Sequence, residues 1–476
     1  MAKSDAEAMV DGVVEKLAKM IQGQNTEVHV AQVVHYGDKL ILPEAMSKRD
    51  AIEHLKRQLK YDEEAINLSF EFPVFLFDGA LAMWKCMKEQ YGFPTQEPTP
   101  GFFSNDPPHV INVATGPTTT VAVPWGRMSV PGVEGWFQTE FSVSQGRFIF
   151  KFSATVKRMY EKSVNELAKR MRVYLQEHSI YRGRAVKLRL RDDDGDLFET
   201  GEMIQVMPSF MDVTKVDENS LVYNQDVRDA IFTNLFIPIK HTQECRAAGV
   251  PLKRGILLAG PYGVGKSLTA YATARVCQEN GWTFFYCERA NELADMVGLA
   301  KQYTPSCIFC EDIDRVMSGE RDMDMDTLLN VIDGIESKGT ELMVVLTTNH
   351  LEHINRAMLR PGRLDAVIHL DLPDHKTVET LIRRYAGDLL PARENIEPAA
   401  TLLQGEIPAV IRECVERAKL SAVRLCPDGG LRLSGEALKD AATLMRKQLD
   451  LLNPAKTQEQ KSNATVLAEA IERMVK

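Results

Sequence analysis

Eight consecutive residues combine the backbone freedom and the side chains that phosphate binding needs. They are Gly260, Pro261, Tyr262, Gly263, Val264, Gly265, Lys266 and Ser267. This order fits the phosphate-loop pattern of Gly, any four residues, Gly, Lys, and then Ser or Thr. In such a loop the backbone N–H groups surround the phosphates, the lysine reaches the β- and γ-phosphates, and the hydroxyl binds Mg²⁺. The stretch therefore predicts a nucleoside triphosphate site with Ser267 as a metal ligand, and the next residue, Leu268, is included in it.

The segments on either side of the loop support this prediction. Residues 255–259 form a short apolar run typical of a buried parallel strand, and residues 268–278 predict a helix. A strand, a glycine loop and a helix N-terminus are the context that phosphate binding requires, because the helix dipole adds partial positive charge. A glycine turn with a chance lysine is the alternative, and these flanks argue against it.

Acidic side chains follow another apolar segment, residues 306–310, which predicts a strand. Glu311 and Asp312 come directly after it. Metal-assisted hydrolysis needs one carboxylate to hold the metal or its water and a neighbour to orient the attacking water. We assign Glu311 to the metal and Asp312 to the water, both as catalytic residues. A plain turn is the alternative, but ligands of parallel sheets bind at the carboxyl ends of the strands, where the phosphate loop also lies.

Further polar residues follow the next predicted strand, residues 342–346. Asn349 could hydrogen-bond a γ-phosphate or the attacking water. Arg360 and Arg363 come shortly after it. Guanidinium groups are permanently charged, rigid donors that suit the transition-state charge on a transferred phosphoryl group. Surface arginines usually only solvate a loop, so the spacing after Asn349 carries this assignment.

The segments GPYGVGKS, CIFCEDID, VVLTTNH and INRAMLRPGRLD, in this order and spacing, resemble the classical AAA branch of the AAA+ ATPases. The resemblance covers about residues 221–440. It implies a homo-oligomeric ring, usually a hexamer, that binds ATP and Mg²⁺ at subunit interfaces. Asn349 would be the first sensor, and Arg360 and Arg363 would reach the nucleotide of the neighbouring subunit. Gly405 and Ala409 would lie where a helical lid approaches the adenine and ribose.

The sequence departs from that family at two places. The family usually has Asp before Glu where this chain has Glu311 and then Asp312. A similar Glu-Asp order occurs in the mitochondrial AAA translocase of the Rieske protein, so the exchange is compatible with hydrolysis. The second departure is Met296, where an aromatic residue that grips a threaded polypeptide is expected. Met296 and Val297 could grip a chain weakly or pack in a core, and both interpretations stay open. The acidic segment 318–326 could line a ring or form a solvated loop.

We expect an α/β fold: a P-loop AAA+ core with a parallel sheet and a C-terminal helical lid, preceded by an α+β N-terminal domain. The predicted divisions are an N-terminal helical segment, an α+β partner-recognition domain, the large ATPase subdomain and the helical lid, at residues 1–65, 66–215, 216–374 and 375–476. Helical spacing predicts helices near residues 5–22, 48–59 and 155–177. The aromatic and proline-rich residues 69–109 suggest an extended connector, and residues 110–155 have a β pattern in which Phe148, Phe150 and Phe152 share one face.

Composition limits the remaining possibilities. The 476 residues carry a formal net charge of −9, which disfavours a general nucleic-acid surface. No apolar run approaches the ~18 residues of a membrane helix, and the N-terminus lacks the apolar core of a signal peptide. The eight cysteines are scattered, as in a reducing cytoplasm, and the Cys307-x-x-Cys310 pair sits in a predicted buried strand. We therefore predict a cytoplasmic protein without a membrane anchor.

The leading functional prediction is a ring-forming ATPase that couples Mg²⁺-ATP hydrolysis to remodelling or disassembly of a protein partner. The N-terminal domain would recognise that partner. The alternative is an ATP-dependent assembly or scaffold protein with slow turnover, favoured by the exchanged Glu311-Asp312 order and the missing aromatic residue. A nucleic-acid translocase is the weakest interpretation, because the chain is acidic. No His-Glu-x-x-His motif occurs, which excludes a fused zinc protease of the membrane AAA type.

Overall fold

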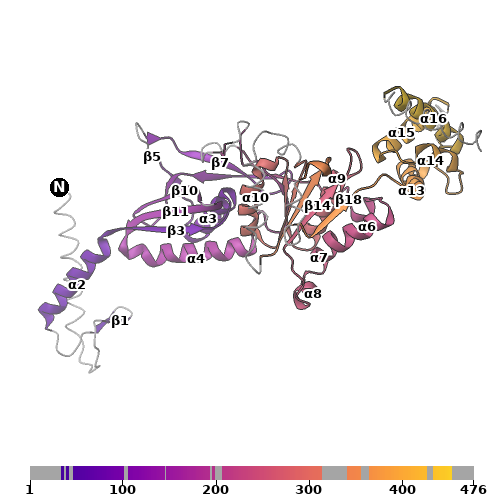
Figure 1. The fold of residues 1–476 in the computed structure, drawn as a ribbon. Helices are drawn as coiled ribbons and strands as arrows, with labels where there is room; N and C mark the ends of the chain where they lie inside the picture. The colour runs from indigo at the N-terminus through magenta and orange to yellow at the C-terminus, as the bar shows by residue number, and fades with distance from the viewer. Residues whose placement is uncertain are drawn as a thin grey trace, which may run out of the picture.

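The computed structural model describes residues 34–36, 39–41, 47–100, 105–144, 146–192, 196–198, 206–313, 340–354, 364–425 and 432–452. Three bodies follow one another along the molecule: an N-terminal α+β domain, a central domain with a mainly parallel sheet, and a C-terminal group of helices (Figure 1). The predicted α/β class, with its parallel sheet and helical lid, is confirmed.

The N-terminal domain is built on a five-stranded antiparallel sheet of order β3-β11-β10-β9-β4. Its strands are β3 Ala65–Phe72, β4 Thr95–Gln96, β9 Arg127–Ser129, β10 Gly135–Ser144 and β11 Arg147–Lys157. Short hairpins pair β1 Val34–Tyr36 with β2 Lys39–Ile41, β5 Thr99–Pro100 with β6 Asn105–Asp106, and β7 His109–Ala114 with β8 Thr120–Trp125. Its helices are α2 Lys48–Glu63, α3 Leu76–Tyr91 and α4 Glu161–Glu177.

Alternating side chains of β11 form the core of this domain. Phe148, Phe150 and Phe152 are fully buried, as their alternation predicted. The helix α3 packs against β11 so closely that a Cβ at Gly79 would lie 2.2 Å from the ring of Phe150. The prediction of an extended connector over residues 69–109 is wrong. Its proline-rich part begins only at Pro94, and the apolar residues before it form α3.

Another prediction about this domain needs correction. The helix expected from residue 155 begins at Glu161, because β11 continues to Lys157 to complete its pairing with β3. The predicted helix at residues 5–22 lies outside the described residues.

The central sheet has seven strands in the order β13-β12-β15-β16-β17-β14-β18. They are β12 Ala185–Lys187, β13 Ser209–Phe210, β14 Arg254–Ala259, β15 Thr283–Cys287, β16 Ser306–Cys310, β17 Leu342–Thr348 and β18 Ala366–His369. All neighbours are parallel except β12 and β13. The carboxyl ends of β14, β16 and β17 therefore meet at one edge, where the phosphate loop, the acidic pair and Asn349 begin.

Helices and apolar residues cover both faces of this sheet. The helices of the central domain are α6 Gln225–Ile231, α7 Ile237–Lys240, α8 Thr242–Ala247, α9 Lys266–Glu279 and α10 Leu293–Ala300. A π-helical turn, Phe232–Phe236, joins α6 to α7. The strands β14, β15 and β16 are buried over nearly their whole length, as expected for parallel strands covered on both sides. Cys307 and Cys310 point into different cores, so the C-x-x-C pair does not converge on one point.

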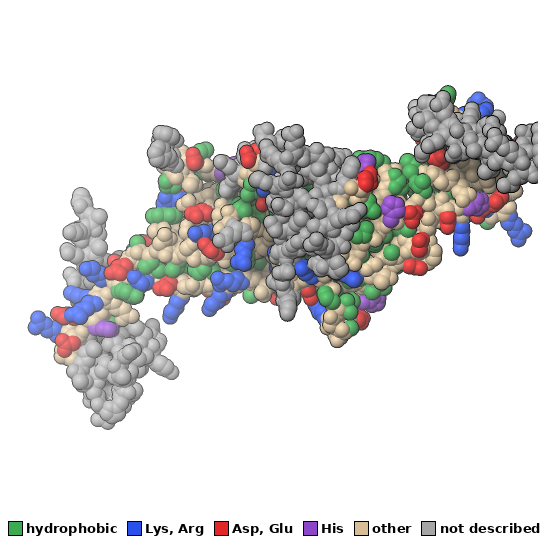
Figure 2. All heavy atoms as spheres, in the orientation of Figure 1, with side chains coloured by type: hydrophobic (Ala, Val, Ile, Leu, Met, Phe, Trp, Pro, Cys, Tyr) green, Lys and Arg blue, Asp and Glu red, His purple; other side chains and the backbone are tan. Residues whose placement is uncertain are grey.

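The C-terminal body contains α13 His375–Ala386, α14 Glu397–Leu403, α15 Pro408–Leu425 and α16 Gly435–Leu452. These helices enclose an apolar core of their own, as the predicted lid requires. Among the described residues, no helix has the length and hydrophobicity needed to cross a bilayer. Figure 2 shows acidic and basic side chains interspersed over the described part of the visible face.

The N-terminal domain and the central domain share one continuous apolar core. The helix α10 forms the junction, since it contacts β15 and β16 on one side and β11 on the other (Figure 1). The strands β12 and β13 also extend the central sheet, although they precede the boundary expected near residue 215. The two domains are therefore one packed unit over this junction.

Candidate nucleotide site

The phosphate loop connects β14 to α9, as its flanks predicted. Gly263 and Gly265 adopt positive φ angles of 80° and 112°. These conformations are strained for residues with a Cβ, so glycine is needed for the loop to turn into the helix. Lys266 and Ser267 lie in the first turn of α9, with the lysine buried and the serine exposed. The loop therefore presents the N-terminal amides and dipole of α9 at the sheet edge.

A chain of polar contacts connects the phosphate loop to Asn349 and Asp312. Lys266 Nζ donates to the carbonyl oxygens of Gly260 and Pro261, at 2.7 and 3.0 Å, and to Asn349 Oδ1 at 2.6 Å. Asn349 Nδ2 donates in turn to Asp312 Oδ1 at 2.9 Å. The carboxamide of Asn349 thus links the loop lysine to the acidic residue on the neighbouring strand end. These contacts join residues 37 and 83 positions apart in the chain.

Asp312 has a backbone conformation that explains its residue type. Its φ is +47°, in the left-handed region, and its N–H donates to Thr347 Oγ1 at 3.0 Å. Asp and Asn visit this region more readily than longer side chains do. The Glu311-Asp312 order therefore places the short acidic residue where the backbone is strained, and the longer one where it is not.

Glu311 lies beside Asp312 with its backbone N–H donating to Cys287 O at 3.1 Å. Its Oε1 atom is buried and has no hydrogen-bond partner among the described residues. Burial, followed by the negative charge of Glu311, raises the pKa of the Tyr286 hydroxyl. A buried carboxylate oxygen is the kind of group to which a cation or a metal-bound water binds.

A cavity of about 700 Å³ opens beside the phosphate loop. It is lined by the loop itself, by the segment before α6, and by α13 and α15 of the lid. A Cβ at Gly263 would lie 2.9 Å from Ile407 Cδ1 and 3.2 Å from Ala409 Cβ, so the start of α15 touches the loop. Ala409 and Leu268 line the cavity, as the nucleotide assignment requires, whereas Gly405 is not among its lining residues. Its volume suits a nucleotide-sized ligand.

Tyr223 is a site residue that the sequence analysis missed. Its hydroxyl donates to Gly265 O at 2.9 Å and lies 2.7 Å from Thr269 Oγ1, so it holds the end of the loop against α9. Burial raises its pKa to about 12. No local pattern distinguishes this tyrosine, because its partners lie more than 40 positions away.

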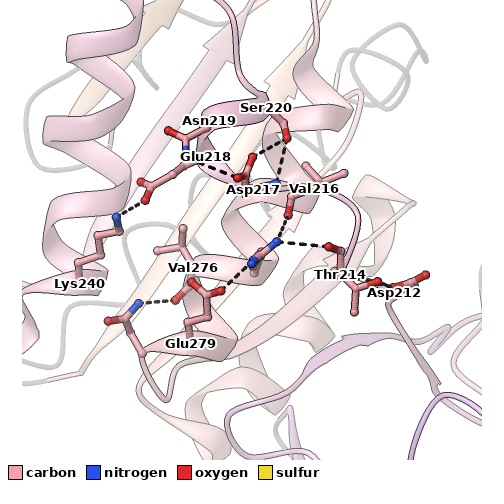
Figure 3. A network of polar contacts seen from close by, with 12 residues as sticks. Asp212, Thr214, Val216, Asp217, Glu218, Asn219, Ser220, Lys240, Val276 and Glu279 are labelled. Atoms are coloured by element: carbon pink, nitrogen blue, oxygen red, sulfur yellow. Dashed lines mark hydrogen bonds and ion pairs between the residues drawn. The ribbon is translucent and has the colours of Figure 1, made fainter. Parts of the chain in front are cut away.

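Part of the segment before α6, residues 212–220, also lines the cavity. No motif in the sequence indicated this role. Arg275 on α9 donates to the carbonyl oxygens of Thr214 and Val216, at 3.3 and 3.4 Å, and pairs with Glu279. Lys240 on α7 pairs with Glu218, and Asp217 accepts from Ser220 Oγ at 2.6 Å (Figure 3). The contacts of Arg275 fix the segment to α9, and the Lys240–Glu218 pair fixes it to α7.

The predicted arginines and the two predicted pore segments remain to be placed. Arg360, Arg363 and the acidic segment 318–326 lie outside the described residues. Met296 and Val297 are buried in the core shared with the N-terminal domain, on α10. Exposing a buried methionine costs about 1.5–3 kcal/mol, so the structure favours core packing over the gripping role.

The described residues fit ATP and Mg²⁺. The loop amides and Lys266 suit phosphate, and the exposed hydroxyl of Ser267 and the buried Oε1 of Glu311 are the kinds of oxygen ligand that Mg²⁺ prefers. The strand order, the phosphate loop and the polar residues at the neighbouring strand ends define a P-loop nucleotide-binding domain of the AAA+ type.

The comparison with known proteins specifies this class. Residues 256–372 match the family described as "ATPase family associated with various cellular activities (AAA)". The chain therefore contains an AAA ATPase domain.

Three relatives are similar to less than half of this chain. A proteasome-activating nucleotidase of Methanoculleus marisnigri is 29% identical over 42% of this chain and 52% of its own length. A 26S proteasome regulatory subunit 8 of Caenorhabditis elegans is 29% identical over 40% of this chain and 50% of its own length. An ATP-dependent zinc metalloprotease FtsH of Mycoplasma mobile is 28% identical over 44% of this chain and 32% of its own length. The chain thus spans about half the length, or less, of these relatives.

Proposed function

We propose that this chain is a ring-forming Mg²⁺-ATPase whose hydrolysis remodels or disassembles a protein partner. The observation that carries the proposal is the contact chain from Lys266 through Asn349 to Asp312 at the edge of the parallel sheet. It joins a phosphate-binding cation to a carboxylate that can orient water, which phosphoryl transfer to water requires. The names of the relatives, which refer to proteasome activation and regulation, support a protein as the target.

Each residue has a role that follows from its position. The loop amides and Lys266 would bind and orient the phosphates, and Ser267 and Glu311 would hold Mg²⁺. The metal, when bound, neutralises charge that develops on the phosphoryl oxygens. Asp312 accepts a proton from the attacking water or orients it, and Asn349 fixes the direction of the Asp312 carboxylate through its 2.9 Å hydrogen bond.

Oligomerisation and location belong to the same proposal. We assign Arg360 and Arg363 to the nucleotide of a neighbouring subunit in a homo-oligomeric ring, a hexamer by analogy with the AAA+ class, and the cytoplasm as its location. The Glu311-Asp312 order supports a resemblance of the AAA module to the Rieske-protein translocase type.

The N-terminal domain is the proposed partner-recognition element. Residues 65–177 form a sheet and helices that share a core with α10, so a displacement of α10 would carry this domain with it. Because Met296 and Val297 are part of that core, they are not exposed to grip a threaded chain. We therefore favour movement of the N-terminal domain as the means by which hydrolysis acts on the partner.

The steady-state Mg²⁺-ATPase rate, measured against protein concentration, tests this proposal. Wild type, Lys266→Ala, Arg363→Ala and Asp312→Asn should be compared. We expect the specific activity of wild type to rise with concentration and to fall by at least about a hundredfold in each variant. A Lys266→Ala protein that hydrolyses ATP at the wild-type rate would remove the basis of the proposal.

The alternative is an ATP-dependent assembly or scaffold protein with slow turnover. The exchanged Glu311-Asp312 order and the burial of Met296, where an aromatic residue is expected, favour it, since both depart from the usual pattern of the family. This alternative predicts that ATP alone drives assembly and that the hydrolysis rate is near background, independent of concentration and unchanged by Arg363→Ala. Sedimentation of wild type with and without ATP, alongside the rate measurement, separates the two functions.

A further inference from the structure

A second cavity, of about 690 Å³, lies at the junction of the N-terminal and central domains. Its walls come from the end of β3, the turn before β11, the C-terminal end of α4, and the segment from α10 to residue 302. Figure 1 shows one end of α4 directed toward the central domain. The residues of α4 that line the cavity, Arg172, Leu175 and Gln176, belong to its C-terminal part. It shares no lining residue with the nucleotide cavity.

Positive charge gathers around this cavity. Arg147, Arg172, Arg182 and Lys301 line it, and none of its described lining residues is acidic. These cations come from four separate segments that converge on one space. Although Lys301 is exposed, partial desolvation and then the charges of Lys253 and Arg147 lower its pKa. Such crowding of like charge is relieved by an anion in the space between them.

Two of the arginines are held in place by contacts within the protein. Arg182 donates to the carbonyl oxygens of Gln302 and Thr304, at 2.8 and 3.3 Å. The guanidinium of Arg172 lies 5.5 Å from the ring centroid of Phe72. A guanidinium has five N–H donors, so these contacts orient the groups and leave donors for a ligand. Phe72, with Val74 and Leu175, also supplies an apolar part of the lining.

We propose that this junction cavity binds a small anion with two phosphoryl groups. Four positive charges match two phosphoryl groups of about −1.5 to −2 each, and guanidinium forks suit phosphate oxygens. The volume is that of a small-molecule site, since such sites span roughly 300–1,000 Å³. The proposal is independent of ATP hydrolysis, because it concerns a separate space and separate residues.

Binding at this position would clamp the two domains together. Arg147 and Arg172 belong to the N-terminal domain, whereas Gly298 and Lys301 belong to the segment that contacts β15 and β16. A ligand held by both sets adds a bridge to the existing contact between Gln302 Nε2 and Phe148 O, at 2.8 Å. An anion here would therefore raise the unfolding temperature of the chain.

The test is calorimetric titration of inorganic pyrophosphate into the full chain at physiological salt and without Mg²⁺. All proteins carry Lys266→Ala, so that binding at the phosphate loop is weakened equally. We expect saturable binding with one site, and a Kd about tenfold weaker after Arg147→Gln or Arg172→Gln, as the loss of one charge-assisted contact predicts. The unfolding temperature of each protein, with and without pyrophosphate, is measured in parallel.

Arg170→Gln is the matched control. It lies on the same helix, α4, makes the same change in charge and does not line the cavity. Its Kd should stay within about twofold of the parent. Absence of saturable binding, or equal weakening in Arg170→Gln, would overturn the proposal. Binding of a tetraglutamate peptide in place of pyrophosphate would also overturn it, in favour of an acidic protein segment. Arg147 lies on β11 and Arg172 on α4, so if one variant misfolds, the other still tests the proposal.

Discussion

Asp78, at the start of α3, is buried where the N-terminal domain meets the central domain. Its carboxylate accepts hydrogen bonds from Ser179 Oγ at 2.6 Å, Ile180 N at 3.1 Å and Tyr303 Oη at 3.2 Å. Burial raises the pKa of Asp78 from 3.8 to about 6, although the three donors oppose the rise. The side chain thus titrates near neutrality inside a domain junction.

The raised pKa of Asp78 predicts that the free energy of unfolding falls as pH rises. Between pH 4 and pH 6 the unfolded chain loses the proton of Asp78 while the folded chain retains it, so the folded state loses stability as pH rises. A rise of the pKa from 3.8 to about 6 corresponds to about 3 kcal/mol, at about 1.36 kcal/mol per pKa unit. This contribution is fully present below pH 4 and is lost once pH exceeds 6.

The assay compares wild type with Asp78→Asn in urea unfolding at several pH values from 4 to 7.5. The asparagine has nearly the same shape and stays neutral, so the free energy of unfolding of Asp78→Asn minus that of wild type should rise by about 3 kcal/mol over this range. Asp106→Asn, at an exposed position, is the control and should show no comparable rise. A difference between Asp78→Asn and wild type that stays constant with pH, or falls, would refute the reasoning.

Four other substitutions, at three positions, have expected outcomes. Gly298→Ala places a Cβ 1.9 Å from Gly146 O, so the free energy of unfolding should fall by about 1–3 kcal/mol. An unchanged midpoint of urea unfolding would contradict this. Tyr223→Phe removes the hydrogen bond to Gly265 O, so ATP affinity, measured by fluorescent-nucleotide titration, should fall about two- to tenfold. An unchanged affinity would show that this hydrogen bond does not help to hold the phosphate loop. Asp312→Asn should retain wild-type stability while hydrolysis falls about 10²–10⁴-fold. Asp312→Ala should in addition lower the free energy of unfolding by about 1 kcal/mol, because alanine tolerates the positive φ less well. Equal unfolding temperatures of the two variants would count against strain at this position.

The sequence by itself determined the phosphate loop and the strand ends around it. Their signals are local: glycines at fixed spacing, apolar runs of strand length, and polar residues directly after them. The rule that parallel strands end at one edge then brings Lys266, Asp312 and Asn349 together without further information. The same locality explains why the alternation of Phe148, Phe150 and Phe152 predicted one buried face.

Only the tertiary structure decided the role of α10. Met296, Val297 and Gly298 match either a pore segment or a core helix, because local spacing does not reveal what covers a residue. The N-terminal domain covers them, through contacts such as the one between Gln302 and Phe148, 154 positions apart. Tyr223 beside Gly265 and the junction cavity depend on similar long-range contacts. Since burial and charge crowding arise only when distant segments meet, neither could be predicted from neighbouring residues.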